Sequence, residues 1–123
     1  MANIMATDAE IILKAGDNYP STLGDSTAIG LYGLQAESYI NVETGFNWSD
    51  WYATTPNADV KYILTEAVSN LAAIYLWNAK PSGEDGTTSR IEYEDRINIL
   101  FARFVQCMDI LTDVGTEAFM KGA

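Results

Sequence analysis

The sequence predicts an all-α protein: a small bundle of about four helices around one long central helix, with an extended C-terminal tail. Two stretches, 59–78 and 91–111, carry most of this prediction, because their apolar residues recur every three or four positions over several turns. A length of 123 residues fits one domain that can bury a core without disulfides or metals. We expect residues 1–113 to form this domain and residues 114–123 to form the tail.

The central helix is predicted over Asp59–Asn78. Its first half is amphipathic, but Leu71–Trp77 is apolar nearly all round, which indicates burial from more than one direction. Thr55 and Pro56 precede it and are typical of an N-cap and a first helical position. Other helices of the chain or a partner chain must therefore cover its second half.

The final helix is expected to begin with a capping box formed by Ser89 and Glu92. Arg96, Arg103 and Asp109 lie off its apolar face. We expect this helix to pack antiparallel to the central helix, with the polar loop 80–89 as the hinge. The predicted apolar face consists of Ile97, Leu100, Phe101, Phe104, Val105, Met108 and Leu111.

The first helix is predicted by the pair Thr7 and Glu10, which have the spacing of a capping box, and by Gly16, which can end a helix in the left-handed conformation. The residues before it, Met1–Ala6, have no pattern and are expected to be a frayed start.

A second helix is predicted to begin directly after Ser26, and Gly45 is expected to end it. Gly30 and Gly33 each cost about 1 kcal/mol relative to alanine in a helix interior. Together with Ala36 they form a smooth strip, which favours close approach of another backbone; an irregular helix start explains them equally well.

The segment 46–53 is the densest aromatic cluster of the chain, with Trp48, Trp51 and Tyr52 at its centre. Such rings are enriched in small cores under loops and also in protein interfaces, so loop packing and an intersubunit contact both remain open. Stacking on nucleic acid would also need a basic groove, and no Lys or Arg occurs between Lys14 and Lys61.

The composition is strongly acidic: 17 Asp and Glu stand against 7 Lys and Arg, giving a net charge of −10 without any histidine. The residues up to Val60 carry eight acids and one base, so the N-terminal half holds most of the excess. Such a charge repels phosphate backbones and disfavours sequence-independent binding of nucleic acid. Solubility alone also accounts for much of it.

Catalytic and metal-binding patterns are missing from the sequence. Without histidine there can be no Ser-His-Asp or Cys-His arrangement, and the single Cys107 lies in an apolar helical pattern typical of an inert buried thiol. Acidic pairs such as Glu92 and Asp95 are placed for helix capping. We therefore expect a soluble protein that is not an enzyme, has no cofactor or metal, and spans no membrane.

The short tail carries an apolar pair, Phe119 and Met120. Such a pair suits insertion into a groove on another protein, and folding back on its own domain is an equal alternative.

The order of these elements resembles the head-tail connector, or adaptor, proteins of tailed bacteriophages. The resemblance covers Thr7–Thr112. It lies mainly in the run AESYI closed by Thr44 and Gly45, and in the long helix with an alanine-rich middle and an aromatic end at Tyr75 and Trp77.

This resemblance implies a non-enzymatic ring, most often of twelve subunits, in the neck of the virion between the portal protein and a downstream neck or tail protein. DNA would pass through without specific binding, and a lumen lined by carboxylates would repel its phosphates. Candidate lining residues are Asp17, Asp25, Glu84 and Asp85.

Two further surfaces are expected from the same resemblance. The C-terminal segment would reach the portal protein through Phe119, Met120 and Lys121. A ring also needs two unlike side surfaces on each subunit. Candidates for the subunit interface are Gly30, Gly33, Ala36, Trp48, Trp51, Tyr52 and Trp77.

The competing function is that of a free acidic binding module, either a DNA mimic or a regulator of another protein. A mimic must display its carboxylates on one face at phosphate-like spacing, whereas the predicted helices scatter them. A persistent monomer that binds a DNA-binding protein would favour this alternative.

Overall fold

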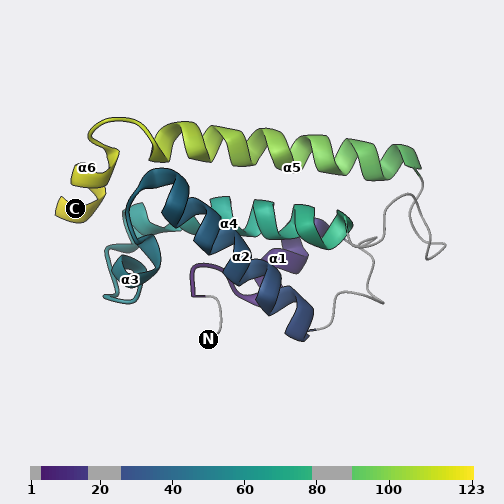
Figure 1. Cartoon of the computed structure of the whole chain (residues 1–123), viewed down its shortest axis with the longest axis horizontal. Coiled ribbons are helices and arrows are strands. Elements are labelled where there is room, and N and C mark those ends of the chain that lie inside the picture. Colours follow the sequence, from purple (N-terminus) through teal and green to yellow (C-terminus); the bar gives the residue numbers. More distant parts are fainter. Residues whose placement is uncertain (1–3, 17–25, 79–89) are drawn as a thin grey trace.

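The computed structural model describes residues 4–16, 26–78 and 90–123, and in these ranges the chain is helical, with no strand. The predicted all-α class is confirmed. Figure 1 shows α4 in the middle of the molecule, with α5 along one side of it and α1 and α2 along the other. The helices are α1 (Asp8–Ala15), α2 (Ser26–Thr44), α3 (Trp48–Tyr52), α4 (Ala58–Asn78), α5 (Arg90–Leu111) and α6 (Thr116–Gly122).

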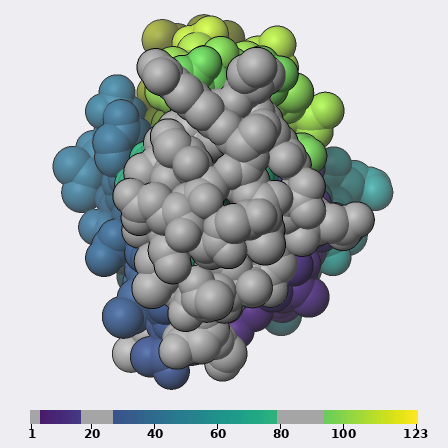
Figure 2. All heavy atoms as spheres, turned by 90° about the vertical axis from the view of Figure 1, so that its right-hand side faces the viewer, coloured from purple at the N-terminus to yellow at the C-terminus, as the bar shows by residue number. Residues whose placement is uncertain are grey.

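Helix α4 is enclosed by helices of its own chain. It packs against α1, α2 and α5, and Figure 2, which looks along the bundle, shows α2 in blue on one side, α1 in purple on the other and α5 in green above them. Ile74, Leu76 and Trp77 are all buried. The apolar second half of α4 is thus covered without a partner chain.

The largest side chain of α4, Trp77, is held by packing and by a hydrogen bond. Only 1% of its surface is exposed, and its Nε1–H donates to the carbonyl oxygen of Ala15 at 2.9 Å. This bond also satisfies one of the carbonyls left without a partner at the C-terminus of α1.

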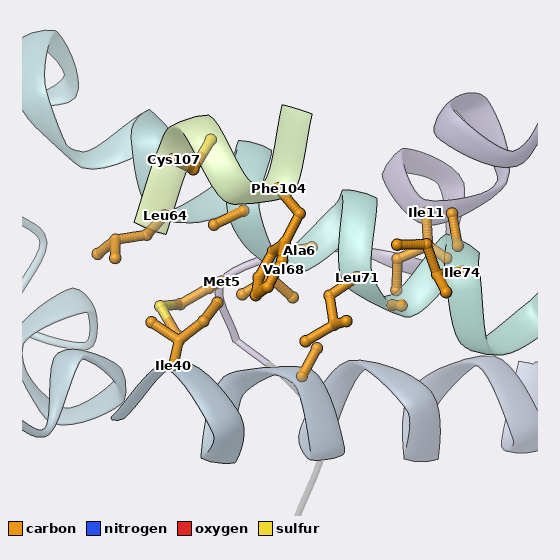
Figure 3. Close-up of a cluster of buried hydrophobic side chains, with 14 of the residues drawn as sticks. Met5, Ala6, Ile11, Ile40, Leu64, Val68, Leu71, Ile74, Phe104 and Cys107 are labelled. Carbon is orange, nitrogen blue, oxygen red and sulfur yellow. The ribbon is translucent and has the colours of Figure 1, made fainter. Parts of the chain in front are cut away.

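Helix α5 returns beside α4 and closes the core from above (Figure 1). Figure 3 shows the buried cluster between α5 and α2, with Phe104 and Cys107 on the α5 side, Ile40 on the α2 side and side chains of α4 between them. The predicted apolar face is correct for its buried members, which are Leu100, Phe104, Met108 and Leu111. It is wrong for Phe101 and Val105, which are exposed.

The thiol of Cys107 is buried, and this burial raises its pKa from 9.0 to about 11. Because the thiolate is the nucleophile, we expect a disulfide reagent at mildly alkaline pH to react far more slowly with the folded protein than in denaturant. The raised pKa also links stability to pH, because the folded state favours the protonated thiol. The stability that the protonated thiol gives to the folded state is complete below pH 9.0 and is lost as the pH rises through about 11. Equal labelling rates in both states would contradict the prediction.

The capping box of α1 and the glycines that end α1 and α2 lie where the sequence predicts them. Thr7 Oγ1 accepts from the N–H of Glu10 and Glu10 Oε1 accepts from the N–H of Thr7, so the capping box is confirmed. Gly16 ends α1 with φ 88°, and an added Cβ there would lie 3.0 Å from the guanidinium of Arg96. Gly45 follows α2 with φ 73°, as predicted.

The start of α4 differs from the prediction. Helix α4 begins at Ala58, and Asn57 takes the capping position because its Oδ1 accepts from the N–H of Asp59 at 2.9 Å. Thr55 has φ 53°, a left-handed conformation outside any helix. The predicted cap of the final helix, Ser89 with Glu92, lies outside the described residues.

Met5 and Ala6 are part of the core and the backbone of Ile4 is hydrogen-bonded, so the predicted frayed start is wrong for these residues. Met5 and Ala6 are buried. The carboxylate of Glu37 on α2 accepts from the N–H groups of Ile4 at 2.5 Å and Met5 at 2.7 Å. Thr65 of α4 donates its hydroxyl to the carbonyl oxygen of Met5 at 2.6 Å.

Residues 114–123 contain a helix where an extended tail was predicted. Helix α6 follows Gly115, whose φ of 94° lets the chain turn sharply after α5. Met120 faces inward and is only 4% exposed. The chain therefore folds back on its own domain, which was one of the two alternatives.

None of the helices in the described ranges is long and apolar enough to cross a membrane.

Candidate assembly surfaces

The first surface is an open groove of about 510 Å³ where α6 meets the start of α4 and the end of α5. Met120 points into the protein, whereas Val114 and Phe119 stay outside, with Phe119 68% exposed. The groove is lined by Asp59, Val60, Ile63, Ile110, Val114, Gly115, Thr116, Phe119 and Met120.

Helix α6 is tied to the rest of the molecule on its other face. The ammonium of Lys121 lies 4.9 Å from the centre of the Phe46 ring and 3.3 Å from a carboxylate oxygen of Glu117. Of the three residues predicted to meet a portal protein, Met120 and Lys121 thus have partners within the chain. Phe119 is 68% exposed, and the side chain of Lys121 is also partly accessible.

The aromatic segment forms a short helix, α3, whose rings pack on one another. Trp48 is fully buried, and its ring meets those of Phe46 and Trp51 edge to face, with centroids 4.7 Å and 5.2 Å apart. Packing under a loop therefore accounts for Trp48. Trp51 is half-buried and keeps part of its ring accessible.

Tyr52 connects this segment to α4. Its hydroxyl lies 3.1 Å from Thr65 Oγ1, the same hydroxyl that donates to the carbonyl of Met5. The ammonium of Lys61 lies 5.0 Å from the centre of its ring. These contacts join α3, α4 and the N-terminal segment.

The remaining residues predicted for a subunit interface lie mostly inside the chain. Gly33 and Ala36 are on the buried face of α2, Gly30 is half-buried, and Trp77 is covered by α1. The candidate channel-lining residues Asp17, Asp25, Glu84 and Asp85 lie outside the described residues.

A surface that sequence reasoning missed runs along α5 on the side that faces α1. We call it the basic stripe: Arg96, Ile99, Arg103 and Ile110, each exposed or half-buried. The first three line a groove of about 360 Å³ together with Leu13, Lys14 and Leu100.

A second stripe follows α5 on the opposite side of its buried face. Successive residues of a helix turn by about 100°, so Phe101 and Val105 fall on one side of the buried Phe104 while Arg103 falls on the other. We call this the acidic stripe: Glu94, Phe101, Val105 and Asp109, all of them exposed. Phe101, at 56% exposure, is a large ring left in water.

Lys14, next to the basic stripe, is already paired. Its ammonium lies 2.6 Å and 2.8 Å from the two oxygens of Glu66, which also accepts from Asn70 Nδ2. Burial tends to raise the pKa of the Glu66 carboxyl, but the bonds from Lys14 and Asn70 outweigh it and hold the pKa below 4.5. Arg103 adds a weaker attraction. Glu66 is thus ionised and partly neutralises this groove.

The part of the chain that the structure describes contains no group of three or more His, Cys, Asp or Glu side chains that could hold a metal ion. The prominent features of these ranges are apolar and charged surfaces that suit contact with other proteins.

Comparison of the chain with protein-family models, with curated proteins and with solved structures found no match. The connector function therefore stays a prediction, and its support comes from the surfaces described above.

Proposed function

We propose that this chain is a structural virion protein, an adaptor that joins the portal vertex of a tailed-phage capsid to the tail. In this proposal its copies form a closed ring around the DNA channel, dock on the portal protein on one side and receive a neck or tail protein on the other. The protein acts by contact alone, without catalysis or a cofactor.

The observation that carries the proposal is the pair of unlike stripes on α5. A ring built by rotation uses head-to-tail contacts, so each subunit must present two different surfaces that fit each other. The basic and the acidic stripe both expose large aliphatic or aromatic side chains on one helix. Phe101, Ile99 and Ile110 give both stripes apolar surface that a contact between copies can bury.

The overall charge is consistent with a DNA passage. A net charge of −10 repels the phosphate backbone, so DNA can move past the ring without being held. The order of helices adds the resemblance to head-tail connectors given above.

Size-exclusion chromatography with light scattering tests this function, with the chain alone and mixed with portal rings from the same phage genome. We expect ring-sized assemblies that are visible by negative-stain electron microscopy, at least when portal rings are present. A chain that stays monomeric in both cases and instead binds a DNA-binding protein would contradict the proposal and favour the acidic mimic.

Phe119 is the residue of α6 best placed to contact the portal protein. Replacing Phe119 with serine removes an exposed ring while Met120 still anchors α6. We expect at least about a tenfold loss of affinity for portal rings in a pull-down titration, as for an aromatic side chain at the centre of an interface.

The matched control for this test is Val42→Ser, which removes a 79% exposed apolar side chain from α2. This variant should bind portal rings as the wild type does. Equal binding by the Phe119 variant would place the portal contact elsewhere.

A further inference from the structure

The two stripes of α5 differ in charge as well as in position. Arg96 and Arg103 lie in the basic stripe, one on either side of Ile99, and Asp109 follows Phe101 and Val105 in the acidic stripe. Each stripe therefore combines apolar side chains with charges of one sign. This arrangement makes one stripe complementary to the other.

The guanidinium groups of the basic stripe form no salt bridge with a carboxylate of the described residues, and Glu66 attracts Arg103 only weakly. Arg96 Nη2 rests against Gly16 at the end of α1, and Arg103 is exposed. Six Lys and Arg residues lie in the described ranges, and three of them are at this groove, namely Lys14, Arg96 and Arg103. In a chain of net charge −10 such a gathering attracts an acidic surface, and every other copy of the chain offers one.

We propose that α5 forms the contact between neighbouring copies, with the basic stripe of one copy against the acidic stripe of the next. This inference rests on the proposed ring and names its interface. Arg96 and Arg103 meet the carboxylate of Asp109, and Ile99 packs with Phe101 and Val105 of the neighbour.

A two-fold contact made through one stripe alone would place that stripe against its own copy. Basic stripe on basic stripe brings guanidinium groups face to face, and acidic stripe on acidic stripe brings carboxylates face to face. Both arrangements are repulsive, so the charges oppose a symmetric dimer that uses a single stripe and favour contact between unlike stripes.

The experiment uses two charge reversals that block one stripe each. Arg103→Glu blocks the basic stripe and Asp109→Arg blocks the acidic stripe, and both residues are exposed. Self-association is measured by sedimentation velocity up to millimolar concentration, alone and on portal rings. Circular dichroism melts confirm that each variant is folded.

We expect each single variant to associate at least about tenfold more weakly than the wild type, because like charges now face each other. An equimolar mixture of the two should regain dimers, since the intact acidic stripe of one variant meets the intact basic stripe of the other. Added salt should weaken wild-type association, because these charges are exposed.

Two control variants carry the same charge changes away from the stripes. Asp95→Arg lies on the outward face of α5 between the stripes, and Lys121→Glu lies on α6. Both should associate as the wild type does in the absence of portal rings.

The outcomes separate this inference from the proposed function. If wild type and both single variants form the same rings, or if the mixture stays monomeric while the wild type associates, the α5 contact is wrong although a ring remains. If the mixture regains dimers but the wild type never docks on portal rings, the α5 contact holds and the adaptor function fails. A wild type that stays monomeric throughout overturns both.

Discussion

Replacing Trp77 with alanine is expected to lower the free energy of unfolding by about 3–5 kcal/mol, the usual cost of deleting a buried aromatic side chain. Trp77 is 1% exposed at the end of α4, where α1 covers it. Its removal leaves a cavity and also leaves the carbonyl oxygen of Ala15 without its donor. The loss should appear as a lower denaturation midpoint in urea titrations followed by circular dichroism.

Phenylalanine variants at two buried tryptophans separate packing from hydrogen bonding. Trp77→Phe loses ring volume and the bond to Ala15, whereas Trp48→Phe loses similar volume at a site whose Nε1–H has no hydrogen-bond partner among the described residues. We expect the first to cost about 1 kcal/mol more than the second. Equal costs would show that the bond from Trp77 adds nothing to stability.

Replacing Glu37 with alanine is expected to cost about 2–4 kcal/mol, because hydrogen bonds to a charged group are lost and buried donors are left unpaired. The carboxylate accepts from two backbone N–H groups, those of Ile4 and Met5, and from the hydroxyl of Ser49 at 2.9 Å. Its loss should release the N-terminal segment first. Hydrogen exchange at Ile4 and Met5 should therefore accelerate more than exchange in α4.

Glu43→Ala provides the control on the same helix, because Glu43 is an exposed acid of α2. It should change the free energy of unfolding by less than about 0.5 kcal/mol. A Glu37 variant as stable as the Glu43 variant would mean that the burial of Met5 and Ala6 and the bond from Thr65 hold the N-terminal segment without Glu37.

The sequence was sufficient for the features that depend on neighbours along the chain. Caps and stops at Thr7, Gly16 and Gly45 follow from residue type within one turn. The burial of α4 on several sides follows from its uniform apolar composition around Ile74 and Trp77.

Features that depend on distant partners could not be predicted. The bond from Met5 to Glu37 joins residues 32 positions apart, and periodicity carries no signal over that distance. Phe101 and Val105 lie at the edge of the apolar arc of α5, and whether an edge is covered depends on where the neighbouring helix ends up. Helix α6 is 7 residues long, too short for a periodic pattern.

The candidate surfaces also combine features that can be read from the sequence with features that depend on distant partners. The outward position of Phe119 and the inward position of Met120 depend on how α6 docks, which the sequence of the tail does not specify. The charges of the basic stripe are visible in the sequence, but Leu13 and Lys14 join Arg96 and Arg103 only through the packing of α1 beside α5.

The contacts of Met5 also decide how early the core can be completed while the chain is being synthesised. Its N–H bonds to a residue 32 positions later, and its carbonyl accepts from a residue 60 positions later. Ala15 likewise meets Trp77 only after 62 further positions. A nascent chain therefore leaves Met5 and Ala15 without these partners until α4 has left the ribosome, and in that interval its apolar side chains are exposed to aggregation.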